Sequence, residues 1–281
     1  MKSSLRIFLT GLAACVVLAV LALAYVYFAS EKQLHRQYQA PLTNLSLPTD
    51  AASIAEGKRL ARLRGCYGGC HGKTLEGRVW EDSLLSGRVV APDLTRVARE
   101  IQPDAMARTV REGVRPNGES VWDMPSNMMF HLADEDIARI IAFIRSEAAL
   151  NGSHRELAYG PLQRWEIVRG NYPSIREEIE KLGRPERAPD RTNPVEFGRY
   201  LARTICSECH GPAFQGQDGS PNLHVMVQAY SQEHFATLMR TGIAAGNRKL
   251  GLMSQVALSR FAYFSDEEVA AVYAFLRSRP K

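Results

Sequence analysis

The sequence predicts an all-α protein in which two helical domains follow one another after an N-terminal transmembrane helix. Three observations support this prediction. The chain opens with a long uncharged apolar run, later segments carry apolar residues at helical spacing, and no stretch of any length alternates as a strand would. A chain of 281 residues is long enough for two domains of ordinary size, and several short motifs occur twice along it.

The N-terminal segment, residues 1–30, has the length and composition of a membrane anchor. Residues 7–29 are 23 consecutive uncharged, mostly apolar residues. As a helix they would span roughly 35 Å, against about 30 Å of bilayer hydrocarbon. Lys2 and Arg6 precede the run and favour a cytoplasmic N-terminus, which would place the rest of the chain outside the cytoplasm.

Two other interpretations of this segment are open. Ala22-Leu23-Ala24 resembles a signal-peptidase site, and Leu12-Ala13-Ala14-Cys15 resembles a lipoprotein box. We favour the uncleaved anchor, but all three interpretations export the chain. Residues 31–50, which include Pro41 and Pro48, are expected to form a tether between the membrane and the first domain.

The two predicted domains cover residues 51–146 and 193–281, and each closes with an amphipathic helix. The apolar stripes of these helices follow the i, i+3, i+4, i+7 pattern and consist of Ile137, Ile140, Ile141 and Ile144 in the first domain and Val269, Val272, Tyr273 and Leu276 in the second. Ser265 and Glu268 predict a capping box. Each domain also has a middle helix candidate, about 104–113 and 232–242. Residues 147–192, rich in proline, are expected to be an interdomain linker with one short helix.

Each domain carries a cluster of two cysteines followed directly by histidine. The clusters are Cys66, Cys70 and His71, with three residues between the cysteines, and Cys206, Cys209 and His210, with two. The second is the signature of covalent c-type haem attachment. Two thiols add to the vinyl groups of the porphyrin, and the histidine reaches one axial face of the iron.

A disulfide or half of a zinc site would also use such cysteines. A structural zinc site needs four ligands, and each cluster supplies only three. A disulfide gives no reason for a histidine directly after both cysteine pairs. Gly68 and Gly69 allow the longer loop of the first cluster to close. The expected cofactors are therefore two covalently bound haem c groups.

A sixth iron ligand decides between carrying electrons and performing chemistry, because a thioether closes the iron and raises its reduction potential. Met124, which precedes Pro125, is the favoured candidate in the first domain, ahead of Met128 and Met129. Met253 is the favoured candidate in the second. Met106 and Met239 lie in predicted helices and are expected in the core.

These motifs resemble tandem class I cytochrome c domains, as in the family of membrane-anchored dihaem cytochromes c. The resemblance covers residues 51–146 and 193–278. It implies that the first and last helices of each domain cross where a glycine faces an aromatic ring, as Gly57 with Phe143 and Gly198 with Phe275. It also implies that the carbonyl groups of Pro92 and Pro221 accept hydrogen bonds from the axial histidines. The first cluster departs from the family in its spacing and in the longer segment before Pro92.

The expected function is electron transfer without catalysis, at the outer face of a bacterial inner membrane, with the haem domains in the periplasm. Expected partners are a quinol-oxidising complex, a dehydrogenase or a terminal oxidase. The alternatives are a haem-carrying subunit of a redox complex, or a dihaem peroxidase or sulfur-compound oxidase. The net charge of +5 is spread along the chain, and no segment is basic enough to indicate nucleic acid.

Overall fold

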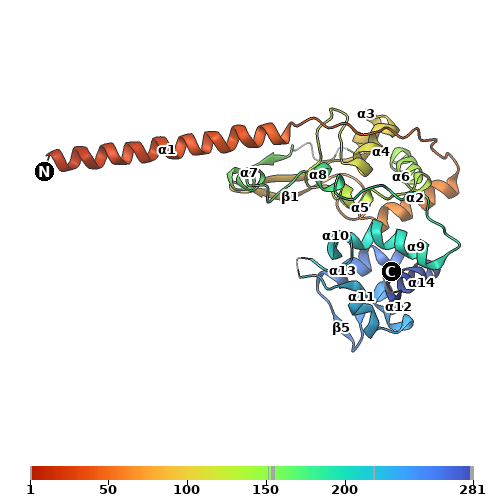
Figure 1. Ribbon diagram of the computed structural model, residues 1–281. Helices are drawn as coiled ribbons and strands as arrows, with labels where there is room; N and C mark the ends of the chain where they lie inside the picture. The colour runs from red at the N-terminus through yellow and green to blue at the C-terminus, as the bar shows by residue number, and fades with distance from the viewer. Residues whose placement is uncertain (1, 151, 153–155, 218, 279–281) are drawn as a thin grey trace.

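A long N-terminal helix projects from a body of two lobes (Figure 1). The computed structural model describes residues 2–150, 152, 156–217 and 219–278. The N-terminal helix is α1 (Lys2–Leu34), and its segment Leu5–Leu34 has a mean hydropathy of 2.7 with none of its most apolar part buried. By length and composition it is able to cross a membrane, as both anchors and signal sequences do.

Helices dominate both lobes. The first lobe, residues 35–192, contains α2 (Ala51–Leu63), α3 (Leu94–Glu100), α4 (Pro103–Glu112), α5 (Ser126–Met129), α6 (Asp134–Ser146), α7 (Pro161–Val168) and α8 (Ile175–Ile179). The second lobe, residues 193–278, contains α9 (Pro194–Leu201), the π-helical turn η1 (Ala202–Cys206), α10 (Ser207–His210), α11 (Leu223–Met226), η2 (Val227–Ala229), α12 (Gln232–Thr241), α13 (Leu252–Ser259), η3 (Phe261–Tyr263) and α14 (Asp266–Arg277).

Each lobe is built around its own pair of crossing helices, and the two crossings are alike. A Cβ atom added to Gly57 of α2 would lie 2.0 Å from the Arg139 carbonyl oxygen of α6 and 3.1 Å from Phe143 Cβ. A Cβ atom on Gly198 of α9 would lie 1.9 Å from the Ala271 carbonyl oxygen of α14 and 2.9 Å from Phe275 Cβ. Glycine therefore permits both crossings at backbone contact, at the glycine–aromatic pairs that the resemblance implies.

The structure contains strands, so the prediction of a purely helical fold is wrong in part. Strands β1 (Arg78–Ser83), β2 (Gly87–Ala91) and β3 (Ala158–Tyr159) form an antiparallel sheet in the order β1-β2-β3, and β4 (Ile243–Ala244) pairs with β5 (Arg248–Lys249). The β1–β2 hairpin occupies the long segment between His71 and Pro92. Five of the six residues of β1 are exposed, so no alternation of buried and exposed side chains marks the strand in the sequence.

The two segments predicted as linker and tether are packed against the first lobe. Residues 147–192 form two helices and β3 instead of one short helix. In the range 31–50, α1 continues to Leu34, Tyr38 is buried, and its N–H donates to the Gly118 carbonyl at 2.8 Å. Proline disfavours helix in such segments, but segments of this kind also pair with neighbouring loops.

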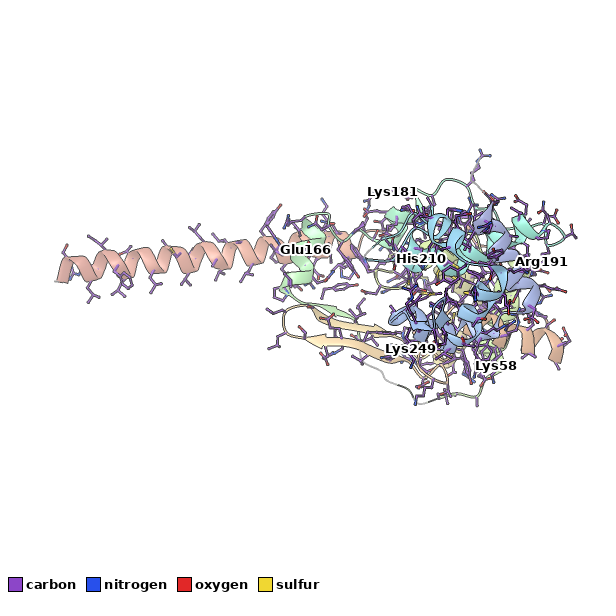
Figure 2. All side chains as sticks on the ribbon, turned by 90° about the horizontal axis from the view of Figure 1, so that it is seen from below. Lys58, Glu166, Lys181, Arg191, His210 and Lys249 are labelled. Carbon is purple, nitrogen blue, oxygen red and sulfur yellow. The ribbon has the colours of Figure 1, made fainter. Side chains whose placement is uncertain are left out.

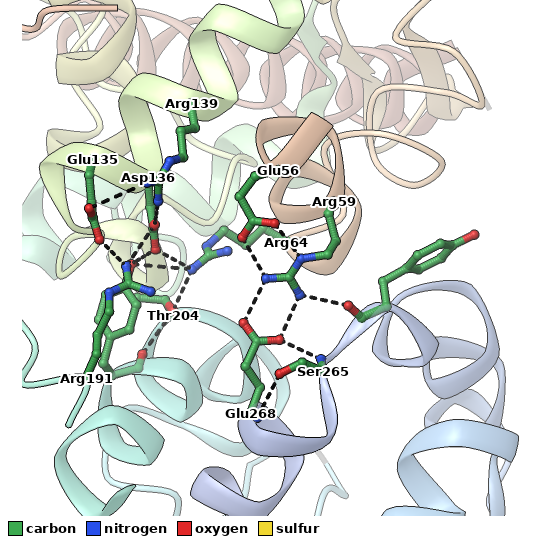
Figure 3. A network of polar contacts seen from close by, with 12 residues as sticks. Glu56, Arg59, Arg64, Glu135, Asp136, Arg139, Arg191, Thr204, Ser265 and Glu268 are labelled. Carbon is green, nitrogen blue, oxygen red and sulfur yellow. Dashed lines mark hydrogen bonds and ion pairs between the residues drawn. The ribbon is translucent and has the colours of Figure 1, made fainter. Parts of the chain in front are cut away.

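One continuous apolar core runs through both lobes, including Leu63 and Leu132 of the first and Leu201 and Ile205 of the second. A polar network crosses the same boundary (Figure 3). The hydroxyl of Tyr200 donates to Asp136 Oδ2 at 2.5 Å, and the fully buried Arg64 lies 3.7 Å from the same carboxylate. The lobes are therefore packed together and are not merely joined by the chain.

Candidate haem sites

The second cluster forms at the end of the first helix of its lobe. Cys206 ends the π-helical turn, and α10 carries Cys209 and His210 through one further turn. Gly211 then reverses the chain with φ of 79°. Both cysteines and the histidine line a cavity of about 500 Å³, which is a usual volume for a cofactor site. Apart from these groups, its walls are mostly apolar, with side chains such as Leu238, Leu250 and Val272.

The structure orients both histidines in the same way. His210 Nδ1 lies 2.9 Å from the Pro221 carbonyl oxygen, and His71 Nδ1 lies 2.9 Å from the Pro92 carbonyl oxygen. A carbonyl only accepts, so Nδ1 carries the proton in each ring. Burial lowers the pKa of both imidazoles and the carbonyl contact opposes this shift. Each ring is thus neutral near pH 7, and its Nε2 lone pair is free to bind a metal.

The first cluster accommodates its extra residue with glycine. Gly68 has φ of 72°, and no neighbouring atom lies within 4 Å of a Cβ atom built there. A Cβ atom on Gly69 would lie 2.5 Å from the Gly65 carbonyl oxygen, which also accepts from Cys70 N–H at 2.6 Å. Trp80 Nε1 donates to the Cys70 carbonyl at 3.1 Å, so the hairpin is fastened to this loop.

The thiols of both clusters are unpaired and differ in exposure, since Cys206 is buried, Cys66 and Cys70 are half-buried, and Cys209 is exposed. Burial raises the pKa of Cys66 to about 11 and that of Cys206 to about 12. The protonated thiol is therefore the stable form at neutral pH. No group of three or more potential metal-binding side chains gathers elsewhere in the ranges that the structure describes, so the zinc interpretation gains no further ligands.

The two candidate methionine ligands differ in position. Met253 lines the cavity together with Cys206, Cys209 and His210, so the second site has all four predicted groups around one space. Met124 packs instead in a small cluster with Val121, Phe130, Ile175 and Ile179. Met128 and Met129 lie in the main core, against which Cys66 also packs. The first site thus has its cysteines and histidine in place, with Met124 held in a neighbouring cluster. Met106 and Met239 are buried, as predicted.

Sequence analysis missed Arg260, which contacts both clusters. Its Nη1 lies 2.8 Å from Glu208 Oε2, between Cys206 and Cys209, and its Nε donates to the Leu63 carbonyl at 3.0 Å. A Cβ atom on Gly65, next to Cys66, would lie 3.2 Å from the guanidinium carbon. Nothing in the local sequence around Arg260 distinguishes it from a surface arginine, since its role depends on the packing of the lobes.

Buried polar atoms beside the clusters lack partners. Arg260 Nη2 is buried without a hydrogen bond, and Arg64 Nε and Nη1 are in the same state. Buried guanidinium groups require an acceptor, and anionic carboxylates are their preferred one. An apolar cavity, two thiols, a neutral imidazole and an unsatisfied guanidinium together fit a haem with its propionate groups.

Comparison with known proteins agrees with this chemistry. The family model described as Cytochrome c matches residues 195–280. The chain is also 24% identical over 276 residues to the fructose dehydrogenase cytochrome subunit of Gluconobacter japonicus, an alignment that covers 83% of this chain and 54% of that protein. The chain thus spans about half the length of the curated relative that it matches. Residues 195–280 are therefore a cytochrome c domain, and the chain as a whole is a distant relative of a dehydrogenase cytochrome subunit.

Proposed function

We propose that this protein is a membrane-anchored dihaem c-type cytochrome that transfers electrons on the periplasmic side of the bacterial inner membrane. The donor would be a dehydrogenase or a quinol-oxidising complex, and the acceptor a terminal oxidase. The single observation that carries the proposal is the position of the two Cys-Cys-His clusters, which lie on either side of Arg260 at the boundary between the lobes.

The first lobe would be a second cytochrome c domain, covering residues 51–146. Three features of the second lobe recur in the first and support this assignment. They are two helices that cross at a glycine, an imidazole bound to a proline carbonyl, and a cysteine pair whose second member directly precedes the histidine. A chain that needed only one haem would have no chemical reason to keep this combination twice.

The protein's own groups would hold each iron in one coordination. Bound haem supplies a one-electron couple. Cys66 and Cys70, or Cys206 and Cys209, fix the macrocycle, while His71 and His210 offer Nε2 to the iron. Met253, and Met124 in the first lobe, would provide the opposite ligand. The apolar walls exclude water, which keeps the change in solvation between the two oxidation states small.

Electrons would cross between the haems through the lobe boundary. Arg260 connects the two clusters, since it donates to the Leu63 carbonyl just before the first cluster and pairs with Glu208 inside the second. The buried polar network of Arg64, Asp136 and Tyr200 holds the two lobes in a fixed relation beside this path. A carrier built in this way needs no motion between the lobes for internal transfer.

A haem count tests the proposal directly. We expect a pyridine haemochrome assay of the purified full-length chain to give two c-type haems, and the double variant Cys66→Ala/Cys70→Ala to give one. One haem in the unmodified chain would refute attachment at the first cluster. The variant Cys15→Ala is the matched control, since Cys15 lies outside both clusters and should leave the count at two.

The first alternative is a haem-carrying subunit fixed in a larger redox complex, because the curated relative is named as a dehydrogenase subunit. Extraction in a mild detergent separates the two possibilities. A permanent subunit would co-purify with its dehydrogenase in constant ratio, whereas an independent carrier would elute alone.

The second alternative, a peroxidase or sulfur-compound oxidase, requires an iron that opens to substrate. It is favoured by the packing of Met124 in a separate cluster. Carbon monoxide distinguishes it from a carrier. If the protein supplies two ligands to each haem iron, neither iron has an open position, and carbon monoxide would leave the spectrum of the reduced protein unchanged. Binding at one haem would show that one iron is open and would favour this alternative.

A further inference from the structure

Large apolar side chains are exposed at the end of the first lobe that lies beside α1. Leu84 and Leu85, in the turn between β1 and β2, are 97% and 65% exposed, and Leu162 and Trp165 of α7 are 52% and 43% exposed. Leu162 and Trp165 are three positions apart and share one face of the helix. A group of this kind on a soluble surface usually marks a contact with another molecule or a membrane.

The hairpin turn and α7 form one structural unit. Leu162 N–H donates to the Leu85 carbonyl at 3.0 Å, and Gly160 N–H donates to the Ser86 carbonyl at 2.9 Å. A Cβ atom on Gly160 would lie 2.3 Å from the Leu85 carbonyl oxygen, so the two backbones are in direct contact. The turn and α7 thus hold the four apolar side chains in a fixed arrangement. We call these four side chains, Leu84, Leu85, Leu162 and Trp165, the apolar rim.

The apolar rim is attached to the end of α1. Arg164 of α7 binds Glu31 Oε1 through Nη2 at 2.6 Å and donates to Ser30 Oγ through Nη1 at 2.8 Å. Its guanidinium carbon lies 4.5 Å from the centre of the Tyr27 ring. Figure 2 shows α7, marked by Glu166, beside the end of α1, with the β1–β2 hairpin reaching back along the same helix.

The composition of α1 places this attachment at a membrane surface. The uncharged run ends at Ala29, and Glu31 and Lys32 follow. A hydrocarbon layer of about 30 Å takes up about 20 helical residues, which the 23-residue run 7–29 supplies. The contacts at Tyr27, Ser30 and Glu31 then lie at the level of the lipid headgroups, where tryptophan and tyrosine are favoured.

We propose that the apolar rim of Leu84, Leu85, Leu162 and Trp165 enters the headgroup region of the membrane that α1 spans. This inference rests on the membrane anchor of the proposed function. The rim makes a second, non-spanning contact with the lipid, so that the first lobe rests on the membrane in one orientation.

Spin labels on single introduced cysteines test this contact in the full-length, haem-loaded chain. The background carries Cys15→Ala, and the labels are placed at Leu84→Cys, Val17→Cys and Val225→Cys, in vesicles of phosphatidylethanolamine and phosphatidylglycerol. Val17 lies within α1, and Val225 is a matched control because it is 70% exposed on the second lobe. Collisions with oxygen report lipid, and collisions with a water-soluble nickel complex report water.

The expected result is a lipid-type ratio at positions 17 and 84 and a water-type ratio at position 225. A lipid ratio at 17 with a water ratio at 84 would overturn the rim while keeping the anchor. A water ratio at 17 would remove the anchor on which both depend. Shielding of position 84 from both reagents would overturn the lipid contact and identify a protein, a second copy or a partner, as the occupant.

Discussion

Arg260 is the residue whose charge acts on both candidate haem sites at once. Its guanidinium lies between the two clusters and is paired with Glu208, so its effective charge at the irons depends on that partner. A cation stabilises ferrous over ferric iron, since the oxidised centre carries the additional positive charge. The two residues should therefore shift the reduction potentials in opposite directions.

We expect Arg260→Gln to lower both haem potentials and Glu208→Gln to raise them. A shift on the order of 40 mV corresponds to about 1 kcal/mol of one-electron free energy. Spectroelectrochemical titration measures both potentials in one experiment. Arg248→Gln is the control, since that arginine is exposed on β5 and should leave both unchanged. A change in the reduction potential of only one haem would show that the Arg260 guanidinium acts on one haem site and not on both.

Met253 should be identifiable by spectroscopy. Replacing it with alanine removes the soft ligand from the second iron, so we expect loss of part of the near-infrared band of the oxidised protein and a lower potential at one haem. Met239→Leu is a matched control, because Met239 lines the same cavity within a helix. Repeating the experiment with Met124→Ala and Met129→Leu determines which methionine serves the first iron. An unchanged band in Met253→Ala would reject the assignment.

His131 provides a test of pH dependence. Burial and the nearby Arg203 lower its pKa to about 4, and the neutral ring accepts Glu186 N–H at 3.1 Å. Below pH 6.5 the unfolded chain binds a proton at this residue that the folded chain does not. Its contribution to the free energy of unfolding therefore falls between pH 6.5 and 4. Denaturant titrations at pH 7 and pH 5 should show that the free energy of unfolding falls less in His131→Gln than in the unmodified chain. An equal fall in both proteins would contradict this prediction.

At the level of elements, the crossing of α9 and α14 depends on one missing side chain. Gly198→Ala would bring a methyl group to within 1.9 Å of the Ala271 carbonyl oxygen, which is backbone and has little freedom to move. We expect a loss of about 2 kcal/mol in the free energy of unfolding, measured by denaturant titration. Gly57→Ala should behave alike at the crossing of α2 and α6. Stability equal to that of the unmodified chain would show that the helices separate without cost.

Helices followed from the sequence to the extent that local chemistry determines them. The stripe of Ile137, Ile140 and Ile144 and the capping box of Ser265 predicted α6 and α14, because periodicity and caps act within a few residues. The β1–β2 hairpin could not be predicted in this way, since its strands are joined by backbone hydrogen bonds and show no apolar alternation. Arg260 was missed because its contacts come from residues about 50 and 200 positions away.

At the scale of the whole molecule, the shared core predicts that the two lobes unfold as one cooperative unit. Arg59 of α2 binds Glu268 of α14 through both nitrogens, at 2.7 and 2.9 Å, and Glu268 also completes the capping box of its helix. Removing the carboxylate takes away the ionic partner of Arg59 across the boundary and leaves the guanidinium with Glu56 and the Tyr263 carbonyl.

We expect Glu268→Gln to lower the free energy of unfolding by about 2 kcal/mol while keeping a single transition. Calorimetry on the haem-loaded protein measures both quantities. Glu267→Gln, one position earlier on the exposed face of the same helix, is the control and should have little effect. Two separate transitions in the unmodified chain would show that the lobes unfold independently.

The β1–β2 hairpin connects the first candidate haem site to the exposed leucines at the hairpin turn. It starts beside Cys70, through the Trp80 contact, and ends at Leu84 and Leu85. Its first strand has six residues and spans about 20 Å. With its turn on lipid, as proposed, the strand length would set the altitude of the first iron over the bilayer. A redox protein embedded in the same membrane must hold its own redox centre at a matching elevation. Lengthening the β1–β2 hairpin by two residue pairs should therefore slow electron exchange with an embedded donor but not with a freely diffusing one.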